Sequence, residues 1–152
     1  MRLELLTGRW IEDKPKRSKT KRLPEASVGD HVDAYLKSLG FYMRVIKSDG
    51  QKLSSGRWIP SKQGRGISDR IGVTDTGRFI GVELKAEGKR KDLTDEQRDF
   101  LTRIIRNGGI GVVADSVESV KAALSMSKEE LLDFLPKPKT EDYQSSLGSL
   151  FP

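Results

Sequence analysis

The sequence SDRIGVTDTGRFIGVELK occupies residues 68–85 and contains two apolar runs separated by Asp75-Thr76-Gly77. Short runs rich in isoleucine, valine and phenylalanine, bounded by a turn signal, are typical of β-strands. We therefore predict two strands, at about 68–74 and 78–85, joined as a hairpin. A three-residue loop ending in glycine is a favoured connection because this last position adopts a left-handed backbone conformation.

The register of this hairpin brings three charged residues onto one face. With Asp75–Gly77 as the loop, counting back along both strands places Asp69 opposite Glu83. Directly opposed residues share a sheet face, and Lys85, two positions after Glu83, shares it too. A two-residue loop would instead pair Asp69 with Val82 and separate the charges. The position of the glycine favours the first register.

Further helices and strands are predicted on both sides of the hairpin. A helix begins at about Pro24, where Glu25 lies three residues before Val28 on the stripe that faces the core. The other predicted elements are a strand over 41–47, a flexible loop over 51–66 around a short strand at Trp58-Ile59, a helix from Thr94 to Asn107, a strand over 110–114 buried on both faces, and helices over 116–124 and 127–135. This order predicts an α/β domain in which helices flank a central mixed β-sheet.

The chain divides into three predicted parts. Residues 1–23 form a basic N-terminal arm, 24–125 the main domain, and 126–152 a C-terminal helix and flexible tail. The arm carries six basic residues and no acidic residue between positions 14 and 22: Lys14, Lys16, Arg17, Lys19, Lys21 and Arg22. We expect it to supply mainly non-specific affinity for nucleic acid.

The net charge is +6, from 28 basic and 22 acidic residues, and the isoelectric point is about 9.6. This balance suits a polyanionic partner, because basic side chains displace the counterions condensed on nucleic acid. A soluble basic protein without such a partner has the same composition. A second basic cluster, Gly88-Lys89-Arg90-Lys91, directly follows the strand that contains Glu83.

Composition also limits the metal chemistry. The chain has no cysteine and one histidine, His31, so thiolate sites and histidine-rich sites are excluded. Carboxylate and backbone oxygens favour a hard ion such as Mg²⁺ or Mn²⁺. Asp69 and Glu83 would supply two ligands, the backbone carbonyl of Leu84 a third, and Lys85 would face the same site. This set suits phosphodiester hydrolysis, which needs charge neutralisation and an activated water molecule.

These residues resemble the PD-(D/E)XK nuclease motif, and most closely its VRR-NUC (virus-type replication-repair nuclease) branch. The resemblance covers about residues 24–125 and implies a restriction-endonuclease-like core. It includes Gly66-Ile67-Ser68-Asp69, in which Ser68 replaces the proline of the motif, and the strand Gly77–Ala86 with Glu83-Leu84-Lys85. It also includes Glu25 at the start of the first helix and the segment Leu93–Gln97.

The resemblance implies that Asp69 and Glu83 bind the metal and that Lys85 is catalytic. It implies supporting roles for Glu25, which would bind the metal through water, and for Gln97, which would position Lys85 or the phosphate. The resemblance to the stand-alone viral members of this family implies that the chain forms a homodimer and cuts branched DNA such as four-way junctions.

The two supporting residues also fit purely structural roles. Thr94 and Gln97 have the spacing of a helix capping box, and Glu25 suits the first turn of any helix. Both roles stay open for each residue.

Basic residues near the predicted site are expected to contact DNA. Arg65 and Arg70 flank Asp69 and are predicted phosphate ligands, as are Lys89, Arg90 and Lys91. We expect Trp10 and Trp58 to be packing residues, because tryptophan serves this role more often than it stacks on bases.

The predicted function is therefore Mg²⁺- or Mn²⁺-dependent cleavage of structured DNA. One alternative is a nicking or restriction-like endonuclease that acts on duplex DNA, and another is a non-catalytic DNA-binding protein on a nuclease-like scaffold. No apolar run approaches the roughly 20 residues of a membrane span, and no secretory signal is evident. We expect an intracellular protein without membrane contact.

Overall fold

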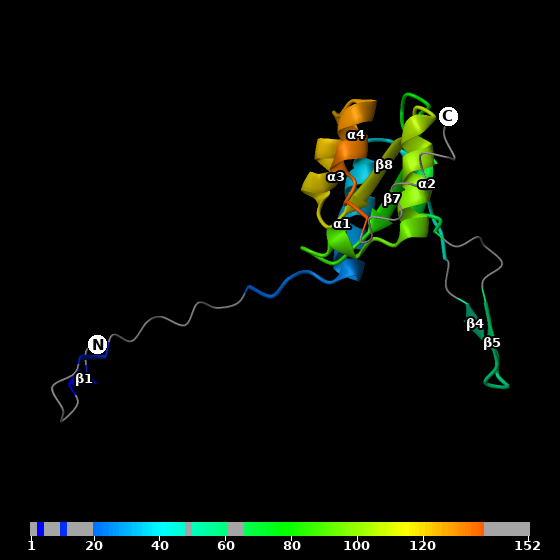
Figure 1. The fold of residues 1–152 in the computed structure, drawn as a ribbon. Coiled ribbons are helices and arrows are strands. Elements are labelled where there is room, and N and C mark those ends of the chain that lie inside the picture. The colour runs from blue at the N-terminus through cyan, green and yellow to red at the C-terminus, as the bar shows by residue number, and fades with distance from the viewer. Residues whose placement is uncertain (1–2, 5–9, 12–19, 48–49, 61–65, 139–152) are drawn as a thin grey trace.

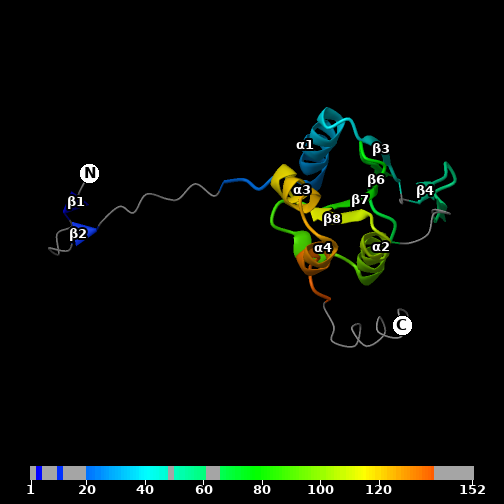
Figure 2. The same ribbon diagram turned by 90° about the horizontal axis from the view of Figure 1, so that it is seen from above.

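A computed structural model describes residues 3–4, 10–11, 20–47, 50–60 and 66–138. Figure 1 shows the whole chain, and Figure 2 shows its central sheet, which has the strand order β3-β6-β7-β8. Strands β3, β6 and β7 are antiparallel, and β7 and β8 are parallel. These strands are β3 (Tyr42–Val45), β6 (Arg70–Val73), β7 (Phe79–Leu84) and β8 (Ile110–Ala114). The predicted α/β class with a mixed central sheet is confirmed.

The β6–β7 hairpin has the predicted register. The N–H of Thr74 donates to the carbonyl of Arg78 over 2.8 Å, and Arg70 lies opposite Val82. Gly77 ends the loop with a φ of +82°, the left-handed conformation that favours glycine. The same register, continued by one residue beyond β6, sets Asp69 against Glu83.

Helices cover both faces of the sheet (Figure 2). One face is covered by α1 (Glu25–Ser38) and α3 (Val117–Leu124), and the other by α2 (Asp95–Arg106) and α4 (Lys128–Phe134). Helix α1 buries Val28, Val32 and Leu36, which recur at helical spacing. Because helices lie on both sides, all five residues of β8 are buried, as predicted for that strand.

Capping residues set the starts of the helices on the second face. The Thr94 side chain accepts a hydrogen bond from the N–H of Gln97, and Ser127 makes the equivalent contact with Glu130. Both helices begin with reciprocal capping boxes. Helix α4 also contributes Leu131 to the buried core, so the core extends beyond residue 125.

Two short hairpins lie outside the central sheet. Strand β4 (Gln51–Lys52) pairs with β5 (Trp58–Ile59), and β1 (Leu3–Glu4) pairs with β2 (Trp10–Ile11). The predicted short strand at Trp58-Ile59 is confirmed as β5, whereas Gln51–Lys52, predicted as flexible loop, forms its partner strand β4. Gly56, at a φ of +81°, closes the β4–β5 turn by donating its N–H to the carbonyl of Leu53 over 2.9 Å. Across the described part of the chain, no helix has the length and apolar character needed to cross a membrane.

Candidate active site

A pair of carboxylates spans two neighbouring strands at one end of the sheet. Glu83 lies on β7, and its side chain is almost completely buried, with 1% of the residue exposed. Asp69 directly precedes β6, and its Oδ2 accepts a hydrogen bond from the N–H of Leu84 over 2.9 Å. The carboxylate of Asp69 is thus held by the backbone of the strand that carries Glu83.

Two side chains donate to one oxygen of Glu83. Lys85 Nζ donates to Glu83 Oε1 over 3.2 Å, and Gln97 Nε2 donates to the same oxygen. Among the described residues, Glu83 Oε2 is buried without a hydrogen-bond partner. Burial, reinforced by the nearby charge of Asp69 and opposed by Lys85, raises the pKa of Glu83 to about 7. The site therefore contains a buried carboxyl group with an unused acceptor.

Gln97 connects this cluster to helix α2. Its Oε1 accepts a hydrogen bond from the N–H of Thr94 over 3.0 Å, which completes the capping box. The same oxygen lies 3.4 Å from Lys85 Nζ. The sequence is compatible with a capping role and with a site role for Gln97, and the geometry contains both contacts.

The donor set fits a magnesium-like ion. Among the described residues, no group of three or more His, Asp or Glu side chains is placed to hold a metal ion. The candidate site therefore offers two carboxylates, those of Asp69 and Glu83. Mg²⁺ commonly binds one or two carboxylates and completes its shell with waters and substrate phosphates. An unpaired buried oxygen on Glu83 is the kind of acceptor that a cation would satisfy. The residues present fit the group that the sequence predicted.

Glu25 is less buried than predicted. It begins α1 but is exposed, so its expected place on the stripe that faces the core is wrong. The start of α1 nevertheless lies beside the segment that follows β7, because Leu23 exchanges hydrogen bonds with Glu87. A contact between Glu25 and a metal through water stays a prediction.

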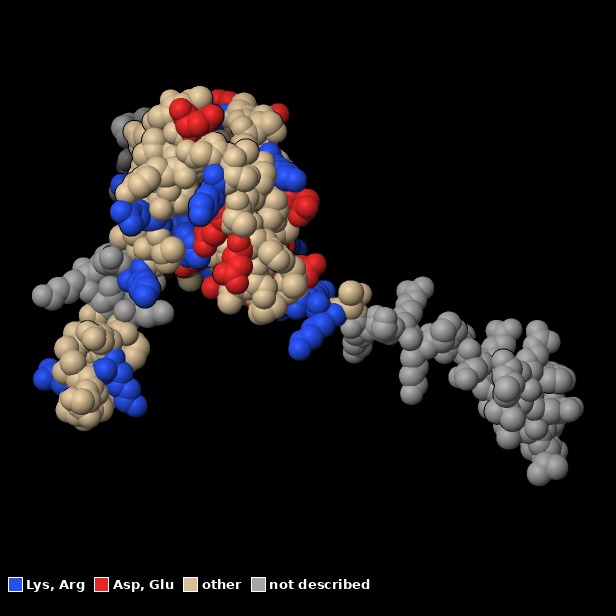
Figure 3. Space-filling view, turned by 180° about the vertical axis from the view of Figure 1, so that it is seen from behind, with Lys and Arg blue, Asp and Glu red and all other residues tan. Residues whose placement is uncertain are grey.

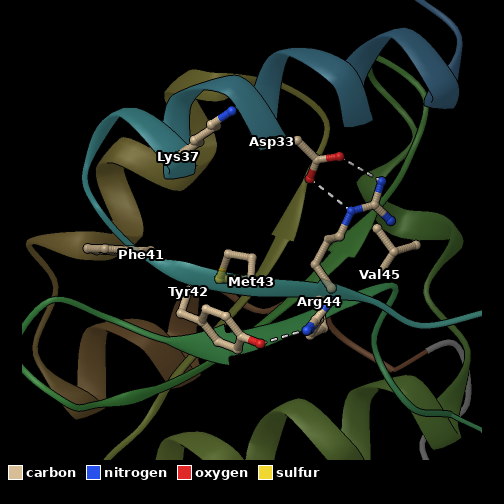
Figure 4. Close-up of a pocket in the computed structure, with 8 residues that line it drawn as sticks. Asp33, Lys37, Phe41, Tyr42, Met43, Arg44 and Val45 are labelled. Carbon is tan, nitrogen blue, oxygen red and sulfur yellow. Dashed lines mark hydrogen bonds and ion pairs between the residues drawn. The ribbon is translucent and has the colours of Figure 1, made fainter.

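Arg70 forms an ion pair with Asp33, whereas the sequence predicted that it would bind a phosphate. Its Nε and Nη2 donate to the two carboxylate oxygens of Asp33 on α1, over 2.8 and 3.0 Å (Figure 4). Arg70 is opposite Val82 in the hairpin, so it faces α1, whereas Asp69 and Glu83 face α2. The structure thus corrects the prediction for Arg70, and it gives Asp33 a role that no sequence signal indicated.

The basic cluster after β7 also separates into two kinds of residue. Arg90 donates from Nε to the carbonyl of Val113 and from Nη2 to that of Phe134, each over 2.9 Å. Its guanidinium lies 4.0 Å from the centre of the Phe134 ring. Arg90 is therefore mainly a packing residue, a correction to its predicted phosphate contact, whereas Lys89 and Lys91 are exposed.

The end of the N-terminal arm lies close to this cluster. The Arg22 guanidinium lies against Gly88, with Nη1 3.4 Å from the position that a Cβ would take there. The other predicted DNA ligands, Lys14, Lys16, Arg17, Lys19 and Arg65, lie outside the described residues. The structure thus brings together the predicted residues Asp69, Glu83, Lys85 and Gln97, with Lys89 and Lys91 on the segment that follows.

No family model matches the chain, and no curated protein matches it.

Proposed function

We propose that the chain is a metal-dependent nuclease that hydrolyses phosphodiester bonds in DNA. One observation carries the proposal: the carboxylate of Asp69 is held by the N–H of Leu84, next to Glu83, and buried Glu83 is held by Lys85 and Gln97 while one of its oxygens has no partner among the described residues. Two acids and a lysine that converge in this way provide the groups that phosphodiester hydrolysis requires.

A purely structural role accounts for this arrangement less well. A buried carboxylate costs free energy unless its oxygens are paired, and a buried polar atom without a partner calls for an explanation. Burial makes the charged form of Glu83 costly and the nearby charge of Asp69 adds to that cost, as the raised pKa of Glu83 reflects. A stable fold could replace Glu83 with an apolar residue, so the cluster supports a binding or catalytic role.

Asp69 and Glu83 would hold Mg²⁺ or Mn²⁺, with the Leu84 carbonyl as a third ligand and Glu25 contributing through water. When bound, the ion supplies charge neutralisation at the scissile phosphate and lowers the pKa of a water molecule. The unpaired Oε2 of Glu83 and the fixed carboxylate of Asp69 support this assignment.

Lys85 and Gln97 would act on the substrate side of the site. The ammonium group of Lys85 is held by Glu83 and lies near Gln97, which limits its freedom before substrate arrives. In the proposed reaction it stabilises negative charge that develops on the phosphate, or orients the attacking water. Gln97 is a positioning residue, since it contacts both Lys85 and Glu83.

The proposed substrate is branched DNA such as a four-way junction. Lys89 and Lys91 would contact phosphates beside the site, and the basic arm would add non-specific affinity. One chain carries one Asp69–Glu83 pair, so two cuts across a junction require two copies, and a homodimer is part of the proposal.

Cleavage assays test this proposal. A labelled four-way junction, a matched linear duplex and supercoiled plasmid are incubated with Mg²⁺, Mn²⁺ or EDTA. We expect metal-dependent cutting of the junction that is lost in Asp69→Asn. Asp75→Asn, which neutralises an exposed acid in the β6–β7 loop, is the matched control and should cut normally.

Comparing cleavage of the three substrates distinguishes the proposed function from its alternatives. Cutting of duplex or plasmid as well as junction would retain the nuclease and remove the preference for branched DNA. Binding of DNA with no cutting in either metal would overturn the proposed activity and favour a DNA-binding scaffold.

A further inference from the structure

Helices cover only part of the sheet face that contains the carboxylate pair. Tyr42 lies opposite Val73, and Val73 lies opposite Phe79, so the three form a row across β3, β6 and β7. Their exposures are 63%, 40% and 43%. Strand alternation puts Phe79 on the same face as Glu83. Helix α2 covers this face mainly at β7 and β8, which leaves the part of the face on β3 and β6 accessible.

An aromatic ring and a guanidinium group meet on this open surface. Arg44 Nε donates to the hydroxyl of Tyr42 over 3.0 Å, and the guanidinium carbon lies 5.2 Å from the centre of the ring. Both side chains point away from α1, on the opposite side of β3 from Met43 (Figure 4). Much of the Tyr42 ring remains available to another molecule.

The β4–β5 hairpin projects away from the body of the domain (Figure 1). It is inserted between β3 and β6, whose adjoining ends are connected by the hydrogen bond from the N–H of Ile46 to the carbonyl of Asp69, 2.8 Å long. The insertion therefore leaves the body at the end of the sheet where Asp69 lies. A molecule bound to the hairpin would lie close to the carboxylate pair.

Trp58 is the largest exposed side chain on this hairpin. It is opposite Lys52, and its indole lies over Gly50, where an added Cβ would approach Cε2 to 2.5 Å. One side of the ring is covered by this contact, yet 58% of the residue is exposed. Leu53 and Ile59 on the same hairpin are also exposed, and a group of exposed apolar side chains is typical of a recognition surface. The expectation that Trp58 is a packing residue accounts for only part of its surroundings.

The hairpin is also basic. Residues 50–60 contain Lys52 and Arg57 and no acidic residue. In the space-filling view, the lobe that projects below the body shows blue side chains and no red ones (Figure 3). Cations beside exposed aromatic rings are the combination that binds single-stranded nucleic acid, through phosphate contacts and base stacking. In an intact duplex the faces of the bases are already stacked, so aromatic rings select for unpaired bases.

We propose that this surface binds an unpaired stretch of the DNA strand next to the scissile phosphate. Its stacking residues are Trp58 and Tyr42, and its phosphate ligands are Lys52, Arg57 and Arg44. The choice of DNA as the occupant rests on the proposed function, and the continuity with Asp69 and the local positive charge support it. The substrate would then be DNA with a single-stranded segment beside the cut, rather than uninterrupted duplex.

Tryptophan fluorescence tests the stacking directly. The chain has two tryptophans, so Trp10→Phe leaves Trp58 as the only indole. This protein is titrated in EDTA with a thymidine oligonucleotide, with a blunt duplex, and with the same duplex carrying a single-stranded tail. We expect strong quenching by the oligonucleotide and the tailed duplex and little by the blunt duplex. Absence of quenching by all three would overturn the proposal.

Variants of the full chain measure the contribution to affinity. Anisotropy of labelled tailed duplex should show about tenfold weaker binding for Trp58→Ala, with most of the affinity retained in Trp58→Phe, because phenylalanine also stacks and packs on Gly50. Lys52→Ala and Arg57→Ala should each lower the salt dependence of binding, whereas Lys128→Ala on α4 should not. Equal affinity for tailed and blunt duplex in every variant would contradict the proposed selectivity.

The experiments can contradict either of the two proposals without contradicting the other. Cleavage without Trp58 quenching would retain the nuclease and remove this surface. Quenching and tail-dependent binding without cleavage in Mg²⁺ or Mn²⁺ would retain the surface and remove the nuclease.

Discussion

Gln97 Nε2 donates a hydrogen bond to Oε1 of Glu83, and Oε1 of the same amide caps helix α2 at Thr94. One side chain therefore both starts the helix and holds a buried carboxyl group of the candidate site. The two functions use different atoms, so substitutions can separate them.

Thr94→Ala removes the cap and keeps the contact between Gln97 and Glu83. We expect the free energy of unfolding to fall by about 1 kcal/mol, with cleavage by the folded protein nearly unchanged. Gln97→Glu keeps the capping geometry but sets a second carboxylate against Glu83, so cleavage should fall about tenfold or more. Urea denaturation and single-turnover cleavage measure both quantities. Equal losses of cleavage in the two variants would contradict a positioning role for Gln97.

The raised pKa of Glu83 predicts a pH dependence of stability without metal. Its pKa is about 7 in the folded protein against an ordinary value of 4.5, so the folded state binds the proton more tightly than the unfolded state. The free energy of unfolding should therefore fall as pH rises from about 4.5 to about 7, by about 3 kcal/mol, and level off above. Urea denaturation in EDTA at several pH values measures this change.

Glu83→Gln is the control for this prediction, because an amide of the same shape does not titrate. The decline in the free energy of unfolding between acidic and neutral pH should be much smaller in this variant than in the wild type. Parallel curves for the two proteins would show that the pH dependence comes from other groups.

The ion pair between Arg70 and Asp33 predicts a stabilising role in place of DNA binding. Its atoms are partly exposed, with side-chain exposures of 14% for Arg70 and 39% for Asp33, so solvent screens part of the attraction. A double-mutant cycle with Arg70→Met and Asp33→Asn should give a coupling of about 1 kcal/mol. The salt dependence of DNA binding should be unchanged in Arg70→Met. A lower salt dependence with intact stability would restore Arg70 as a phosphate ligand.

The basic residues after β7 should likewise differ in role, with Lys89 and Lys91 binding DNA and Arg90 stabilising the fold. Replacing both Lys89 and Lys91 with alanine should reduce the slope of log affinity against log salt by about two, one for each lost phosphate contact. Arg90→Ala should change this slope less and lower stability by about 2 kcal/mol, because the carbonyls of Val113 and Phe134 each lose a donor. Anisotropy and urea denaturation distinguish the two effects. Equal changes in slope for Arg90 and either lysine would contradict this division.

Local patterns were sufficient for much of the fold. The glycine at position 77 predicted the length of the loop, and the loop length determined that Asp69 and Glu83 are opposed. The apolar spacing of Val28, Val32 and Leu36 predicted α1. These features depend on backbone conformations and side-chain periods that neighbouring residues determine.

The contacts of the charged side chains required the tertiary structure. Arg70 neighbours Asp69 in sequence, but alternation along a strand turns it to the opposite face, where Asp33 lies within hydrogen-bond distance. Arg90 belongs to a basic run, but its contacts come from Val113 and Phe134, which the chain brings there only after β8 and α4 are packed. The exposure of Trp58 likewise depends on a hairpin that stands away from the helices.

Sequence alone determined the class of the domain, the order of its helices and central-sheet strands, and the face on which Asp69, Glu83 and Lys85 lie, because turn geometry and periodicity are local properties. Only the tertiary structure decided that Gln97 contacts Glu83, which oxygen of Glu83 lacks a partner, and which arginines are used in packing. Those outcomes depend on long-range packing, in which residues far apart in the chain compete for the same buried volume and the same hydrogen-bond donors.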